Sequence, residues 1–127
     1  MQLSNYLFFT TGCEAALAFY AECGLGRVTE LTRQGASRRV MHARFEGPGV
    51  LFHASDNDDA EPMRGSAHML TMDNREQTTR LFTLLSEGGR ITTPLGPQPW
   101  SAWYGKLTDR FGVQWMLNCP TTAPRAG

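Results

Sequence analysis

Apolar side chains recur at helical spacing in two segments of the chain. The first segment covers about residues 12 to 23, and its apolar stripe consists of Ala16, Phe19, Tyr20 and Cys23. The second covers about residues 74 to 87, and its stripe consists of Leu81, Phe82, Leu84 and Leu85. Steps of three and four residues place such side chains on one face of a helix. We therefore predict two amphipathic helices.

Polar residues before each helix and glycines after it mark the predicted ends. Thr11 and Glu14 have the S/T-x-x-E form of a capping box, and Asn74 and Gln77 offer an equivalent pair before the second helix. Such side chains accept hydrogen bonds from the amides that a helix start leaves without partners. Glycine follows both segments, as a left-handed C-terminal cap requires.

Segments typical of strands surround the two helices. One precedes each helix: NYLFFT at 5–10 and AHMLTM at 67–72. After the first helix we predict strands at about 27–33, 38–46 and 50–55, with breaks at Gly35 and at Gly47-Pro48-Gly49. After the second we predict strands at 90–94, about 102–108 and 112–118, and a proline-rich loop at 93–101, TPLGPQPWS. The order strand, helix, three strands occurs twice.

A short repeated phrase supports this duplication. GRVT at 26–29 is followed by GRIT at 89–92, an offset of 89 − 26 = 63 residues. The same offset pairs Phe19 with Phe82, and Gly49 with Gly112. We predict an α+β fold in which two βαβββ modules, about residues 3–56 and 67–119, form a curved mixed sheet within one domain.

The segments outside the modules are polar. Residues 57–66 are predicted as a linker and 120–127 as a flexible tail. Four acids at and just before the linker are interpreted as solubilising surface charge: Asp56, Asp58, Asp59 and Glu61.

Composition excludes several classes of function. Lysine plus arginine equals aspartate plus glutamate at 12 each, so no global field favours nucleic acid or an anionic membrane. No segment has the roughly 20 apolar residues of a membrane span, and no signal peptide is visible, so we expect a cytoplasmic protein. The three cysteines show no CxxC spacing, which argues against a disulfide framework or a structural zinc site.

Several phrases resemble a known family. LFFTTGCEAALAFYAECGLG, VMHARF and SEGGRITTPLGPQPWSAWYGKLTDRFGVQWMLN are similar to the PhnB-like branch of the vicinal oxygen chelate superfamily. That superfamily includes glyoxalase I, extradiol dioxygenases and the bleomycin and fosfomycin resistance proteins. The resemblance covers about residues 5 to 119. It implies the doubled fold, and it implies a homodimer that binds a small molecule.

The resemblance also implies four positions for metal ligands, one from the first strand and one from the last strand of each module. With the 63-residue offset, these positions are Asn5 and His53 in the first module and His68 and Met116 in the second. A catalytic divalent ion needs about three histidine or carboxylate ligands. Only His53 and His68 qualify, as weak candidates. We therefore expect no metal or other cofactor.

An alternative keeps the metal. His53 and His68 would then bind a divalent ion with Glu46 or Asp109 from neighbouring segments, in a lyase or dioxygenase. A third possibility, a methyltransferase, is rejected, because the chain has no glycine-rich loop after a first strand and no room for a Rossmann domain. A duplicated ferredoxin-like module is a structural rival, but it requires two strands after each helix rather than three.

Alternation along the strands suggests which side chains face a pocket. Leu51, His53 and Ser55 form one row of the fourth strand, and Gln114, Met116 and Asn118 form the matching row 63 residues later. Both rows are more polar than their opposites, so we assign them to the cavity. In VMHARF, Met41, Ala43 and Phe45 form the apolar row, and His42 faces either the pocket or solvent.

Two further features are candidates for chemistry. Trp100, Trp103 and Tyr104 follow a proline-rich stretch and are predicted to form a ligand wall or a dimer contact. Cys13 lies in the first turn of a predicted helix, where the helix dipole lowers a thiol pKa, although no base is adjacent in sequence.

Overall fold

The chain forms two compact units that divide between Pro62 and Met63. The computed structural model describes residues 1–120, so all of the predicted tail except its first residue lies outside the described residues. Each unit has the order strand, helix, three strands. The prediction of an α+β fold built from two repeated modules is confirmed, and the three strands after each helix exclude the ferredoxin-like rival.

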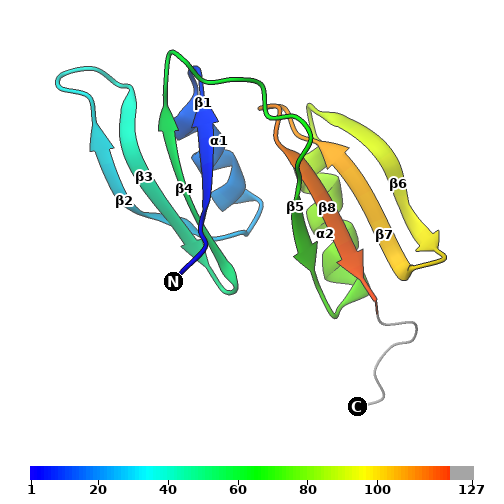
Figure 1. Ribbon diagram of the computed structural model, residues 1–127. Coiled ribbons are helices and arrows are strands. Elements are labelled where there is room, and N and C mark those ends of the chain that lie inside the picture. Colours follow the sequence, from blue (N-terminus) through cyan, green and yellow to red (C-terminus); the bar gives the residue numbers. More distant parts are fainter. Residues whose placement is uncertain (121–127) are drawn as a thin grey trace. The chain divides into compact units, whose positions relative to one another are not determined.

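The first unit is a four-stranded mixed sheet with one helix (Figure 1). Its elements are β1 (Asn5–Phe9), α1 (Cys13–Glu22), β2 (Arg27–Arg33), β3 (Val40–Gly47) and β4 (Val50–Asp56). The strand order is β1-β4-β3-β2. β1 runs parallel to β4, and the other pairs are antiparallel.

The second unit repeats this topology with the order β5-β8-β7-β6. Its elements are β5 (His68–Thr71), α2 (Arg75–Ser86), β6 (Arg90–Gln98), β7 (Ser101–Thr108) and β8 (Gln114–Cys119). β5 runs parallel to β8, so in both units the first strand pairs with the last. A parallel pair requires a long crossover connection, which the helix and the two middle strands supply.

Aromatic and aliphatic side chains fill the space between each helix and its sheet. In the first unit the Tyr20 ring meets Phe45 and Phe52 edge-on, at centroid distances of 6.5 and 6.1 Å. Phe45 and Phe52 stack on each other at 4.8 Å. In the second unit Phe82 and Leu85 of α2 are buried, as are Trp115 and Leu117 of β8. Five residues of the two predicted stripes are buried, and three are half-buried: Cys23, Leu81 and Leu84.

The repeated glycine of GRVT and GRIT has a steric role in both units. A Cβ atom at Gly26 would lie 2.2 Å from the backbone oxygen of Glu46, and one at Gly89 would lie 2.3 Å from that of Thr108. These backbone atoms cannot move aside as the end of a flexible side chain can. Both positions therefore require glycine, because the strand that follows starts against the backbone of its neighbour.

One predicted loop is a strand. Most of residues 93–101 belongs to β6, which continues to Gln98 despite Pro94 and Pro97. β6 is an edge strand and pairs on one side only, with β7. A proline, which has no N–H to donate, can therefore be accommodated in it. Its pairing with β7 is irregular at three places, so proline shifts the register instead of ending the strand.

The start of α1 also differs from the prediction. Gly12, with φ of 86°, is the cap residue and makes no side-chain hydrogen bond. The side chain that serves this helix start comes from the end of β4: Asp56 Oδ1 accepts from the Cys13 amide at 3.0 Å. Asp56 Oδ2 accepts from the Val40 amide at 2.9 Å. By contrast, the Asn74 cap of α2 is confirmed, since its Oδ1 accepts from the Gln77 amide.

Asp56 is therefore a buried structural carboxylate and not the solubilising charge that the sequence suggested. It is 4% exposed and joins the starts of α1 and β3 to the end of β4. The polar context of SDNDDAEP hid this role, because burial follows from the neighbouring elements and not from composition.

We expect Asp56→Ala to lower the free energy of unfolding by about 2 to 4 kcal/mol, because two buried amides lose their acceptor. Urea denaturation measures this. Asp58→Ala is the matched control: Asp58 forms a surface ion pair with Arg39 and its side chain is 94% exposed, so its loss should cost less than about 1 kcal/mol. Equal effects of the two substitutions would contradict the assigned role.

Candidate functional site

Each sheet has a face that its helix does not cover, and we call it the helix-free face. In β4, Phe52 and Ala54 are buried towards α1, and the alternation of the strand directs His53 to the opposite side. The predicted assignment of His53 to the more polar row agrees with this placement. His53 is half-buried.

Strand register brings three side chains next to His53. Tyr6 of β1 is its partner in the parallel pair, and Arg44 of β3 is its partner in the antiparallel pair. His42 lies two residues before Arg44 on the same row. Its Nε2 is 3.0 Å from Nδ1 of His53, which is a hydrogen bond. His42 therefore shares the helix-free face with His53.

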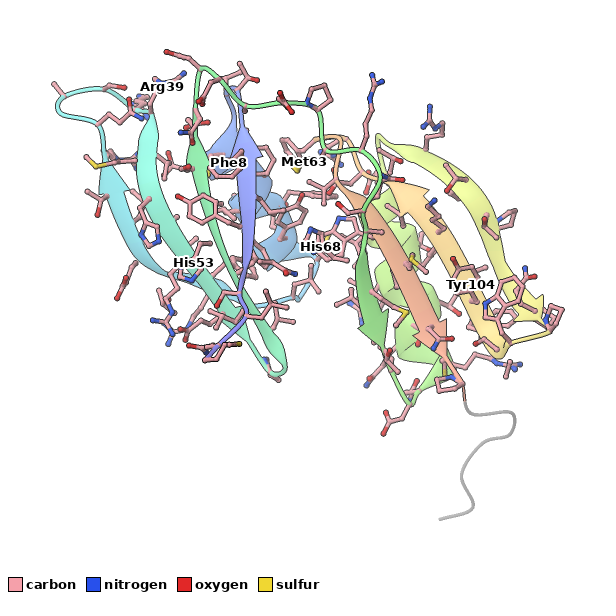
Figure 2. All side chains as sticks on the ribbon, viewed as in Figure 1. Phe8, Arg39, His53, Met63, His68 and Tyr104 are labelled. Carbon is pink, nitrogen blue, oxygen red and sulfur yellow. The ribbon has the colours of Figure 1, made fainter. Side chains whose placement is uncertain are left out.

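Four rings form a continuous row across this face, which we call the aromatic strip: Phe8, Tyr6, His53 and His42. Tyr6 stacks on Phe8 at a centroid distance of 4.7 Å, and it is nearly parallel to His53 at 6.0 Å. The two imidazole centroids are 5.1 Å apart. Figure 2 labels Phe8 and His53 on this sheet. Tyr6 and Phe8 are 40% and 47% exposed, which is unusual for rings that stack.

Charged groups border the strip without adding a net positive charge. Nε of Arg44 forms a close ion pair with Glu46 Oε1, with the geometry of a charge contact and not of an aligned hydrogen bond. Glu30 of β2 is the cross-strand partner of Arg44 on its other side. Arg27 of β2 is in turn the cross-strand partner of Glu46, so two carboxylates and two guanidinium groups alternate beside the strip.

The predicted β3 row needs one correction. Val40 is fully buried and Met41 is 53% exposed, the reverse of the expectation that Met41 belongs to the apolar row. A register shift between Thr32 and Arg33 of β2 leaves Met41 without a partner. This bulge reverses the alternation before His42.

Asn5 does not share a face with His53. It is in register with the buried Phe52 and stands on the row of Leu7 and Phe9, which are buried. The residue of β1 that faces the same side as His53 is Tyr6. NYLFF is apolar at most positions, so alternation alone could not choose between the two rows.

In the second unit, too, the first-strand residue on the helix-free face is one position later than the predicted one. Met69 is in register with Met116, and both lie on the helix-free face. His68 is in register with the buried Trp115, and the ring centroids are 5.3 Å apart. The two histidines that the sequence grouped as weak metal candidates therefore stand on different rows of their sheets.

Glu46 and Asp109, the suggested replacement ligands, are engaged elsewhere. Glu46 pairs with Arg44. Asp109 is 3% exposed and accepts from three groups: the Phe111 and Val113 amides at 2.8 and 3.0 Å and Trp115 Nε1 at 2.8 Å. Its carboxylate closes the turn before β8.

The aromatic residues near the turn between β6 and β7 also lie on opposite faces of their sheet. The Trp103 indole faces α2, where its Nε1 donates to Thr79 Oγ1 at 3.0 Å and the Arg75 guanidinium lies 4.5 Å from its ring centroid. Tyr104 stands on the other row, in register with Asn118, and Trp100 packs edge-on against it at 5.6 Å. Trp100 is 68% exposed. Trp103 therefore helps to hold α2, and only Trp100 and Tyr104 remain candidates for a ligand wall.

Lys106 adds a charge to the helix-free face of the second unit. It is the cross-strand partner of Met116 and stands one step along the row from Tyr104. Sequence inspection did not single it out, because a lone lysine in a strand is ordinary at a surface.

The donor set does not fit a divalent metal centre. Within residues 1–120, no group of three or more His, Cys, Asp or Glu side chains is arranged to hold an ion. The first-strand and last-strand residues on the helix-free faces are Tyr6 and His53 in one unit and Met69 and Met116 in the other. The first face thus offers two imidazoles that hydrogen-bond to each other, and the second offers thioethers, which are poor ligands for cations that prefer oxygen and imidazole.

Cys13 is excluded as a nucleophile. It is fully buried, and burial together with the carboxylates of Asp56 and Glu14 raises the pKa of its thiol to about 12. Burial, together with these carboxylates, thus outweighs the effect of the helix start, and the thiolate that nucleophilic chemistry needs is disfavoured.

Comparison with known proteins identifies the family. Residues 2–117 match the Glyoxalase/Bleomycin resistance protein/Dioxygenase superfamily. The chain belongs to this superfamily.

Relatives cover nearly the whole chain. Protein PA1353 from Pseudomonas aeruginosa is 36% identical in its crystal structure, with a TM-score of 0.86 and coverage of 94% of this chain and 97% of that one. The PhnB protein from Bacillus cereus, described as a putative 3-demethylubiquinone-9 3-methyltransferase, is 25% identical, with a TM-score of 0.82 and coverage of 94% and 99%. Protein YjdN of Escherichia coli K12 is 26% identical over 98% of this chain and 99% of its own length.

The resemblance to the superfamily and to its PhnB-like members is thereby confirmed. Among the described residues, neither helix is long and apolar enough to span a membrane.

We expect His68 to titrate below its ordinary pKa of about 6.5, because burial lowers its pKa more than Asp109 raises it. Its neutral form is then favoured in the folded state. The stability that it contributes is present above about pH 6.5 and is lost as the pH falls through the lower, folded value. NMR titration of His68 and urea unfolding at several pH values measure both effects, and His68→Gln should flatten this part of the pH profile. A folded pKa at or above the ordinary value would contradict the expectation.

Proposed function

We propose that this protein binds a small organic molecule on its helix-free faces without a divalent metal ion, as a homodimer. The observation that carries the proposal is the pair of registers that places Tyr6 beside His53 and Met69 beside Met116. Members of this superfamily share the doubled fold. In this chain, the side chains on the helix-free faces offer a surface for ligand recognition but no set of oxygen and imidazole ligands for a metal ion.

The character of the faces supports an organic ligand. Exposed rings and thioethers contribute apolar contact, and His42, His53 and Lys106 contribute a few polar groups among them. Small-molecule sites typically combine a mainly apolar lining with a few placed polar groups.

The description of the Bacillus cereus relative does not lead us to propose methyl transfer. Both described units consist of a βαβββ module, and neither begins with the strand, glycine-rich loop and helix of a nucleotide-binding domain. No residue described above has a role specific to that chemistry.

Exposed apolar side chains on the edge strands support association between copies. Met69 of β5 is 58% exposed, and Ile91 of β6, the other edge strand of that sheet, is 49% exposed. Exposed apolar edge strands favour pairing with another chain.

Sedimentation velocity is expected to give twice the mass of one chain, and a monomer at all concentrations tested would contradict the dimer.

Elemental analysis tests whether the protein binds a divalent metal ion. Protein purified without a histidine tag is expected to contain far less than one equivalent of zinc, nickel, manganese or iron by elemental analysis. Added ions should leave the unfolding temperature unchanged, because too few hard ligands converge. His68→Ala and His53→Ala serve as paired variants. Stoichiometric metal that disappears in either variant would contradict the proposal and favour the metal-dependent lyase or dioxygenase.

A further inference from the structure

The hydrogen bond between His42 and His53, a pair here called the histidine dyad, limits which ring nitrogens can carry a proton. Each neutral imidazole carries one N–H and one lone pair. The inner contact, from Nε2 of His42 to Nδ1 of His53, uses one of each. The two outer nitrogens, Nδ1 of His42 and Nε2 of His53, must then present one N–H and one lone pair. Reversing the direction of the inner hydrogen bond exchanges these roles, provided that the outer N–H proton is also lost from His53 and gained by His42 through solvent.

The dyad lies at one end of a surface suited to a flat ligand. The aromatic strip continues from the imidazoles through Tyr6 to Phe8, and these two rings are exposed on the helix-free face. Aromatic rings gain about 2- to 10-fold in affinity from an additional stacked or edge-on ring. A ring that stacks on Tyr6 can place its substituent against the imidazoles.

We propose that the aromatic strip binds a flat conjugated ring carrying a weakly acidic O–H group, and that the histidine dyad accepts its proton. The inference rests on the proposed function and names a ligand class for it. It needs no metal ion and no co-reactant.

The proton transfer balances within the pair and its ligand. The ligand O–H bond breaks heterolytically and leaves its electron pair on oxygen. A new N–H bond forms at the outer nitrogen that holds the lone pair. The dyad becomes one imidazolium hydrogen-bonded to one imidazole, and the ligand becomes an anion. The inner contact is then a hydrogen bond from a cation, which is stronger than a neutral one.

The surrounding charges favour entry of the neutral acid. By register, the ionisable groups on this face are Tyr6 of β1, Arg27 and Glu30 of β2, and Arg44 and Glu46 of β3. The two carboxylates balance the two guanidinium groups, so a preformed anion finds no net positive charge. After transfer, the imidazolium supplies the counter-charge, with Arg44 directly opposite His53.

A chromophoric acid tests the proposal. 4-Nitrophenol absorbs at longer wavelength when it ionises, and 4-nitroanisole has the same ring without the acidic proton. At about half a pH unit above the ordinary imidazole pKa of ~6.5, where a free imidazole is mostly neutral, bound 4-nitrophenol is expected to show a larger fraction of the ionised absorbance than the free dye at the same pH. It should bind about 10- to 100-fold more tightly than 4-nitroanisole, the difference made by a charged hydrogen bond.

Phenylalanine variants separate proton transfer from stacking. His42→Phe and His53→Phe keep a ring in the strip but remove the nitrogens. Both should abolish this increase in ionised absorbance and the preference for 4-nitrophenol, while 4-nitroanisole binds within about 2-fold of wild type. Tyr6→Leu should weaken both dyes, and His68→Phe, in the other unit, should change neither. Circular dichroism and unfolding temperature confirm that each variant folds.

Three results would overturn the inference: no binding of 4-nitrophenol up to its solubility limit, binding without an increase in ionised absorbance, or an increase that survives both phenylalanine substitutions. A failure of the proposed function is recognised separately, by stoichiometric metal in tag-free protein. Binding of both dyes with equal affinity would leave that function intact and refute only the role of the dyad.

Discussion

The parallel pairing of each first strand with the last strand of its unit is the constraint on which the candidate site depends. In a sheet, residues in register share a face, and a shift by one residue sends every side chain to the other face. This register places Tyr6 beside His53 and Met69 beside Met116, and it turns Asn5 and His68 towards the helices. The chemistry available on each helix-free face is thus decided by one step along two short strands.

Two buried carboxylates show how the repeated units have diverged. Asp56 ties the end of β4 to the starts of α1 and β3, and Asp109 closes the turn before β8. The 63-residue offset does not relate them, since 56 + 63 = 119 is a cysteine and 109 − 63 = 46 is Glu46. Each unit satisfies its buried amides by a different route. Neither acid is available as a ligand, although in sequence one resembled surface charge and the other a replacement metal ligand.

The candidate site combines features that are unusual together on a sheet surface. Two histidines hydrogen-bond across strands, two aromatic rings remain exposed beside them, and the nearest guanidinium is matched by carboxylates. Burial of these rings in the core would stabilise the unit more than exposure does. Their exposure is in keeping with the recognition surface that we propose.

Hydrophobic spacing, the repeated phrase and the glycine breaks were enough to predict both helices, the succession of strands along the chain and the duplicated plan, because these depend on local periodicity and on turn chemistry. The sequence also identified His53 and Met116 as members of the more polar rows, since alternation in β4 and β8 is pronounced. It could not orient β1, where four of the five residues in NYLFF are aromatic or apolar. The bulge at Met41, the contact between His42 and His53, the division of Trp103 from Trp100 and Tyr104, and the burial of Asp56 were decided only by tertiary structure. Each depends on which strand or helix lies opposite, and that information is absent from the spacing of residues along a single segment.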